Sequence, residues 1–169
     1  MRRGSVTIRS VTEEDWREVR ALRLEMLEDT PIAYGETLEQ ATRLPEAEWR
    51  MRGRRGQEPR SASFVAVDDA SLAWVGTMGG YLPPTGLPLL VGVYVAPGFR
   101  GAVPGVADRL LTAVESWARG YDTSIALHVH EDNARAIRFY ERHGYADTGR
   151  RLDYELAPGA REHEMTKRL

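Results

Sequence analysis

Three polar side chains in the segment LHVHEDNARAIRFYERHGY, residues 127–145, are of types that transfer protons or hydrogen-bond a ligand: His128, Asn133 and Tyr140. Imidazole and phenol groups donate and accept hydrogen bonds, and an amide does both at separate atoms. Asn133 and Tyr140 are two helical turns apart, so they share one face of a helix that contains both. The alternative is structural, with Asn133 as a helix cap and Tyr140 packed in the core beside Phe139.

A second segment, VYVAPGFRGAVPGVADRLL at residues 93–111, runs from a β-branched stretch through a glycine-containing turn into an apolar pattern of helical type. Such a junction gathers backbone N–H groups at the positive end of a helix dipole, and this arrangement binds phosphate groups. Arg100 adds a cationic side chain. The segment lacks the Gly-Lys-Ser/Thr of nucleotide-binding loops and the full glycine pattern of dinucleotide folds, so an ordinary structural turn is the alternative.

The elements that would position these segments alternate between strands and helices. Alternating stretches predict strands, and apolar residues three and four apart predict helices. The expected order is a strand at 6–10, a helix between 12 and 30, two short helices between 32 and 52, a hairpin of strands 63–67 and 72–81, a strand at 89–95, a helix at 104–121, a strand at 125–129, a helix at 134–143, and two strands at 146–156 and 163–169.

Composition limits the class of protein. The 169 residues suffice for one compact domain, expected to span residues 1–169. The net charge of −2 argues against a nucleic-acid partner, and no apolar run approaches the roughly 20 residues of a membrane helix. The chain has no cysteine, which excludes disulfides, thiolate nucleophiles and cysteine-ligated zinc and suits a reducing cytoplasm. We expect a cytoplasmic protein with no metal and no membrane partner.

Together the two segments resemble the Gcn5-related N-acetyltransferase (GNAT) superfamily. The first part of its acetyl-CoA signature follows the fourth strand and reads Arg/Gln-x-x-Gly-x-Gly/Ala; RGAVPG at 100–105 matches it in part. The second part follows the fifth strand and reads Asn-x-x-Ala-x-x-x-Tyr; NARAIRFY at 133–140 matches it. The order of the other elements agrees over nearly the whole chain. The resemblance implies an α/β (α+β) fold: a mixed central sheet of six to seven strands, helices on both faces, and strands four and five splayed apart.

The resemblance also implies an acetyl-CoA site along the splayed strand and the glycine turn. Backbone groups of Val93 and Val95 would pair with the pantetheine arm, and N–H groups of the turn would hold the pyrophosphate. Asn133 would hydrogen-bond the pantetheine, and Tyr140 would lie by the sulfur. The expected cofactor-binding residues are Val93, Tyr94, Val95, Arg100, Gly101, Ala102, Val103, Gly105, Val106, Asn133 and Tyr140.

The turn departs from the family pattern at two positions. Val103 stands where the family prefers glycine, and Pro104 has no N–H with which to bind a phosphate. Proline nevertheless suits the first turn of a helix, because the donor that it lacks would have no helical partner there. We therefore expect a pyrophosphate cradle with fewer donors, and micromolar affinity for acetyl-CoA.

The implied reaction is direct transfer of the acetyl group to a primary amine, of a small molecule or of a protein, within a ternary complex. Tyr140 would be the acid; a phenol of pKa about 10 can hydrogen-bond a thiolate whose conjugate acid titrates at about 8.5. His128 is one candidate base, because some peptide N-terminal acetyltransferases of the superfamily carry a catalytic glutamate at this spacing before Asn133. Glu39 or Glu36 is a second candidate, and a water relay is a third.

The acceptor is left open by the sequence. Glu36 and Glu39 would suit a cationic amine, whereas RMRGRRGQEPR at 50–60, predicted to be a solvated loop, would suit an anionic one. The incomplete first signature also leaves room for an acyl-CoA-binding module without turnover. The family often dimerises, and the final strand is a candidate place for a homodimer contact.

Overall fold

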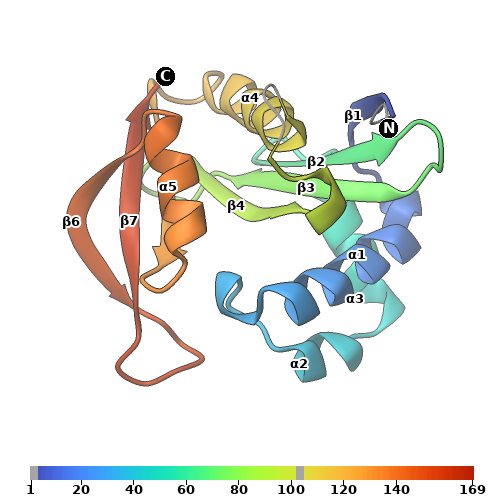
Figure 1. Cartoon of the computed structure of the whole chain (residues 1–169), viewed down its shortest axis with the longest axis horizontal. Helices are drawn as coiled ribbons and strands as arrows, with labels where there is room; N and C mark the ends of the chain where they lie inside the picture. Colours follow the sequence, from blue (N-terminus) through green and yellow to red (C-terminus); the bar gives the residue numbers. More distant parts are fainter. Residues whose placement is uncertain (1–3, 102–104) are drawn as a thin grey trace.

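The computed structural model describes residues 4–101 and 105–169, and its elements follow the predicted order (Figure 1). The strands are β1 (Val6–Ser10), β2 (Ser61–Asp68), β3 (Trp74–Tyr81), β4 (Leu89–Val95), β5 (Ser124–His130), β6 (Ala146–Asp153) and β7 (Arg161–Arg168). The α-helices are α1 (Trp16–Asp29), α2 (Leu38–Thr42), α3 (Glu46–Arg54), α4 (Val106–Ala118) and α5 (Ala134–Arg142), with 3₁₀ turns η1 (Glu13–Asp15), η2 (Pro31–Ala33) and η3 (Pro97–Phe99). Ala102, Val103 and Pro104, which the sequence analysis assigned to the cofactor-binding turn, lie outside the described residues.

The seven strands form one mixed sheet in the order β1-β2-β3-β4-β5-β7-β6. The parallel neighbours β4 and β5 pair only through Leu89 and Leu90 of β4, and beyond these residues the two strands separate. At the same level the register between β3 and β4 shifts around Gly92, whose φ of +61° suits glycine. An extra residue of this kind bends the strand that carries it. The predicted mixed sheet with a splay between strands four and five is confirmed.

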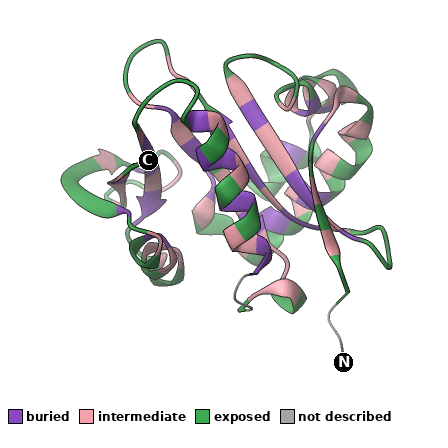
Figure 2. Ribbon diagram, turned by 90° about the horizontal axis from the view of Figure 1, so that it is seen from above, coloured by how far each residue is buried: buried purple, intermediate pink, exposed green. Residues whose placement is uncertain are grey.

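Helices cover both faces of the sheet, as predicted: α4 lies on one face, and α1, α2 and α3 lie on the other (Figure 1). The apolar stripe of α4 packs against β3, β4 and β5 and forms the larger core. The side chains of α1 and α3 form a second core with Tyr94 of β4. Buried positions accordingly follow the inward faces of strands and helices, and exposed positions follow the outer faces and loops (Figure 2). No helix within residues 4–101 and 105–169 combines the length and apolar character needed to cross a membrane.

The prediction of a loop over residues 50–60 is wrong for its first half, because α3 continues to Arg54. Two glutamate–arginine pairs one helical turn apart, with N···O distances of 2.7 and 3.3 Å, support the helix. Trp49 and Gly53 form its buried face, and a Cβ at Gly53 would lie 2.6 Å from the carbonyl oxygen of Thr12. The helix can therefore continue to Arg54 because Gly53, which has no side chain, lets it pack closely against the backbone of Thr12.

The final strand β7 lies inside the sheet, between β5 and β6, and both of its edges are paired. The outer edge on this side belongs to β6, whose residues are mostly exposed. The homodimer contact expected at the final strand stays a prediction; β7 has no free edge to which a second copy could add a strand, whereas β6 has one.

Candidate active site

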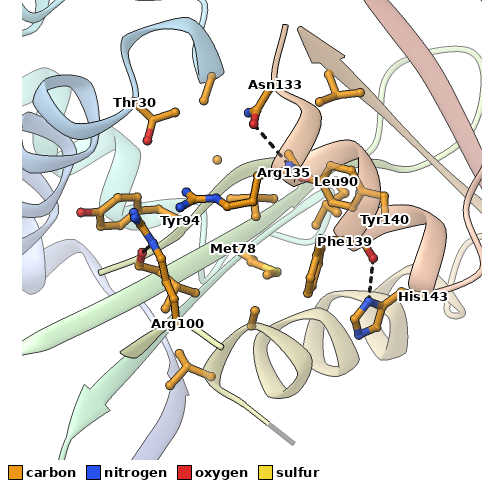
Figure 3. Close-up of a pocket in the computed structure, with 18 of the residues that line it drawn as sticks. Thr30, Met78, Leu90, Tyr94, Arg100, Asn133, Arg135, Phe139, Tyr140 and His143 are labelled. Carbon is orange, nitrogen blue, oxygen red and sulfur yellow. Dashed lines mark hydrogen bonds between the residues drawn. The ribbon is translucent and has the colours of Figure 1, made fainter. Parts of the chain in front are cut away.

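The gap between β4 and β5 opens into a pocket of about 730 Å³, lined by both strands, the start of α4 and one face of α5 (Figure 3). The pocket brings together ten of the sequence-predicted residues that the structure describes: Val93, Tyr94, Val95, Arg100, Gly101, Gly105, Val106, His128, Asn133 and Tyr140. Across the described part of the chain, no cluster of three or more His, Asp or Glu side chains is placed to hold a metal ion.

The edge of β4 presents backbone groups to the gap. The N–H of Ala96 donates to β3, so by alternation the backbone groups of Val95 and Val93 face β5, from which β4 has separated. Their carbonyl oxygens already accept hydrogen bonds, Val93 from the Tyr34 hydroxyl at 2.8 Å and Val95 from Arg100 Nε at 2.7 Å. The N–H groups of the same two residues have no strand partner there and can donate to a ligand.

Arg100 and Tyr94 hold this edge in place. Besides its bond to the Val95 carbonyl, the Arg100 guanidinium pairs with Asp29 at the end of α1 and lies over the Tyr94 ring, 5.7 Å from its centroid. The Arg100 hydrogen bond lowers the pKa of the Asp29 carboxyl. Tyr94 is buried among the residues of the second core, and its hydroxyl donates to Glu25 at 2.9 Å. Both side chains therefore stabilise β4 through contacts with α1.

The start of α4 offers the N–H groups that the first turn of a helix leaves unpaired. One of them is occupied: the Gly105 N–H donates to Asp108 Oδ2 at 2.5 Å, and Asp108 Oδ1 lies 2.6 Å from His143 Nε2. Burial opposes ionisation of Asp108, but the Gly105 N–H and His143 outweigh it and lower the pKa of this carboxyl. A negative charge therefore stands beside the predicted phosphate site.

Tyr140 and Asn133 extend toward the pocket from α5 (Figure 3). Tyr140 is only 6% exposed, and no described residue forms a hydrogen bond with its hydroxyl. Burial is the main cause that raises the pKa of Tyr140, so the phenol stays protonated at neutral pH and acts as a donor. The Asn133 side-chain oxygen accepts the Ala136 N–H at 3.3 Å and caps α5, as its structural interpretation predicted, which leaves the amide –NH₂ for a ligand.

The candidate bases His128 and Glu39 occupy different environments. His128 lines the pocket, and its Nε2 lies 3.6 Å from Glu164 Oε2, a carboxylate that also accepts a hydrogen bond from Arg150 at 3.1 Å. Glu39 projects from α2 with 74% of its side chain exposed, pairs with Arg43 at 2.6 Å, and does not line the pocket. The geometry therefore favours His128 over Glu39.

The pocket also contains polar residues that the sequence did not predict there, among them Tyr34, Asp108 and His143. Asp108 follows the glycine cap of α4 by three residues, a spacing typical of an acidic residue that caps a helix, and this signal was available. Tyr34 reaches Val93, 59 residues away, and His143 reaches Asp108, 35 residues away. No local pattern reports contacts across such separations.

Comparison with known proteins identifies the family. The model of the acetyltransferase (GNAT) family matches residues 16–145, whereas no curated protein matches the sequence. A GNAT-family acetyltransferase from Streptococcus pneumoniae shares the fold with a TM-score of 0.79 at 16% identity, covering 98% of this chain and all of the other. PaiA N-acetyltransferase from Thermoplasma acidophilum, solved with coenzyme A, gives 0.74 at 19% identity and covers 98% and 99%. The yncA protein from Salmonella typhimurium, a putative acetyltransferase solved with acetyl-CoA, gives 0.76 at 15% and covers 98% and 95%. The chain belongs to the GNAT family of acetyltransferases.

Proposed function

We propose that this protein transfers the acetyl group of acetyl-CoA to a primary amine, held with the donor in one ternary complex. The observation that carries the proposal is the convergence, in one pocket, of the unpartnered β4 edge, the start of α4 and the buried Tyr140 hydroxyl. Structures of related fold contain coenzyme A or acetyl-CoA, which supports the choice of donor. The cytoplasmic location favoured by the absence of cysteine belongs to the same proposal.

The residues present fit a CoA thioester. The N–H groups of Val93 and Val95 can hydrogen-bond an extended amide-containing chain, and one of them can polarise the thioester carbonyl as negative charge develops on its oxygen. The amide of Asn133 supplies a further donor. At the start of α4, the N–H groups that follow Gly105 can bind a phosphate. Asp108 opposes this contact electrostatically, which agrees with micromolar affinity.

His128 would accept a proton, and Tyr140 would stabilise the leaving sulfur. His128 takes the proton that the attacking amine must lose, and the Glu164 carboxylate beside it favours the resulting imidazolium. Tyr140 donates a hydrogen bond to the sulfur as the carbon–sulfur bond breaks. Because burial raises the pKa of this phenol, we assign it the stabilisation of the thiolate by hydrogen bonding, with the proton supplied in full by solvent.

Two measurements test the proposal. Titration calorimetry with acetyl-CoA should give micromolar affinity, and folded protein that binds neither acetyl-CoA nor CoA would rule out any CoA-dependent function. Thiol release on a panel of amines should then show turnover. Binding without turnover on any amine would instead support an acyl-CoA-binding module, the second candidate, which the incomplete first signature at residues 100–105 favours.

A further inference from the structure

A second cavity, of about 820 Å³, lies on the opposite face of the sheet, between α1, α3 and strands β2, β3 and β4. It shares two wall residues, Val91 and Gly92, with the first pocket. Gly92 belongs to the bulge at which β4 separates from β5, and Val91 precedes it. A molecule in the second cavity therefore reaches the splayed part of β4 from the side opposite α4.

Arginine dominates the charged lining of this cavity, with four arginines against two glutamates: Arg23, Arg52, Arg55, Arg60, Glu36 and Glu58. Glu36 is already neutralised. Its Oε2 accepts from Arg23 Nε at 2.9 Å and from Arg52 Nη1 at 3.0 Å, and its Oε1 accepts from Arg52 Nη2 at 2.8 Å. A carboxylate engaged by two guanidinium groups is a poor partner for the ammonium of a cationic acceptor. The acidic residue that could have selected such an acceptor is therefore occupied.

Two hydrogen-bond donors of the lining are unused. Arg55, the C-cap residue of α3, lines the cavity, and its guanidinium makes no hydrogen bond or ion pair with any residue that the structure describes. Trp49 is 1% exposed, and its indole Nε1 is the one buried side-chain nitrogen or oxygen in the described residues that lacks a hydrogen-bond partner. A buried N–H without an acceptor is costly, and an oxyanion satisfies both an N–H and a guanidinium.

We propose that this cavity binds an oxyanion, carboxylate or phosphate, carried by the acceptor amine, and that Arg55 and the Trp49 indole N–H are its ligands. The amino group of the same molecule then extends past Val91 to the bulge of β4. This inference rests on the proposed acetyl transfer and narrows its substrate class to amines that also bear an anionic group. It resolves the choice between cationic and anionic acceptors that the sequence left open.

A spectroscopic titration tests the site without using turnover. The four tryptophans give indole N–H signals in a ¹H–¹⁵N correlation spectrum, and Trp49→Phe assigns the signal of interest. A pool of L-α-amino acids and, separately, O-phosphoethanolamine should shift the Trp49 signal in a saturable manner. The corresponding α-carboxamides and ethanolamine, which keep the amine but lack the oxyanion, should not. The two anionic arms distinguish carboxylate from phosphate, and a signal unmoved by both overturns the proposal.

Kinetics with a matched pair of variants supply the second test. Arg55→Gln should raise the KM of the anionic acceptor roughly 10- to 100-fold, the range of a lost charge-assisted hydrogen bond, and leave acetyl-CoA affinity unchanged. Arg54→Gln removes the same charge one residue earlier, from a side chain that does not line the cavity, and should change neither quantity. The inference would be overturned if the wild-type protein preferred carboxamides or the polycation spermidine to the anionic acceptors and Arg55→Gln did not change that preference. Absence of acetyl-CoA binding by the wild-type protein would instead remove the proposed function, and the indole titration would still decide the anion site.

Discussion

Replacement of Tyr140 by phenylalanine separates the catalytic role of this residue from its structural role. No described residue hydrogen-bonds the hydroxyl, whereas the ring packs 5.6 Å from Phe139 and 5.7 Å from Tyr145, measured between centroids. Tyr140→Phe keeps the ring and breaks no bond within the protein. We therefore expect the free energy of unfolding to change by less than about 1 kcal/mol.

The same substitution should lower turnover by about 10²-fold, which corresponds to roughly 2.7 kcal/mol of transition-state stabilisation. Because burial raises the pKa of Tyr140, its hydroxyl stays protonated from pH 6 to 9, and the loss should be constant across that range. Thiol release measured at saturating acetyl-CoA gives the turnover, and calorimetry checks that acetyl-CoA affinity is retained.

Tyr145→Phe is the matched control. Its hydroxyl donates to the buried carboxylate of Glu115 at 3.1 Å, and Lys167 lies 2.8 Å from the same carboxylate. Loss of a hydrogen bond to a charged group costs about 2 kcal/mol, which lowers Tm by roughly 4–8 °C in a domain of this size, with turnover preserved below Tm. Full turnover of Tyr140→Phe, or a Tm lowered as much as in Tyr145→Phe, would contradict the proposed role of the Tyr140 hydroxyl.

Three further predictions follow from the charged groups. His128→Ala should abolish the limb of the turnover profile that reports the base, and a limb that persists or that moves with the pKa of the acceptor amine would contradict its assignment as base. Burial opposes ionisation of Glu36, but Arg52 and Arg23 outweigh it and lower its pKa below the ordinary 4.5. The stability that Glu36 contributes is therefore fully present at a pH above that ordinary value and is lost as the pH falls through the lower pKa of the folded state. The difference in urea unfolding free energy between wild type and Glu36→Gln should accordingly shrink toward pH 3. A difference that stays constant with pH would contradict this prediction. Asp108→Asn should tighten CoA binding roughly 5- to 10-fold by calorimetry, because it removes about 1 kcal/mol of repulsion near the phosphate site, and weaker binding would show that the carboxylate is not close to the phosphates.

The elements that carry the site follow from local patterns. The spacing of Leu110, Leu111 and Val114 predicts a helix because those residues fall on one face whatever that face packs against, and the structure buries all three. Gly144 directly follows the predicted helix at 134–143, and its φ of +89° shows why a residue without a Cβ is needed there. The end of α3 could not be predicted in this way, because it depends on how closely Gly53 approaches the backbone of Thr12.

The position of the open β4 edge was expected on the basis of family resemblance, but which of its backbone atoms are open was not. Val93 and Val95 were correctly expected beside the gap. Which of their backbone atoms remain open depends on two side-chain donors: Tyr34, which follows η2 and reaches Val93 across 59 residues, and Arg100, which folds back onto Val95. A sequence shows that a tyrosine and an arginine are present, but contacts formed by folding decide which carbonyl each one occupies.

The sequence by itself determined the class of fold, the order of its elements and the residue types available for acid–base chemistry, because periodicity and side-chain identity are local properties. Only the tertiary structure decided which charges are available. Glu36 and Glu39 are equally acidic in the sequence, yet the packing of α1, α2 and α3 places Glu36 between two guanidinium groups and leaves Glu39 in solvent. The same packing leaves Arg55 unpaired among the described residues. The strength of a charge as a ligand depends on its neighbours in space, and the fold sets those neighbours.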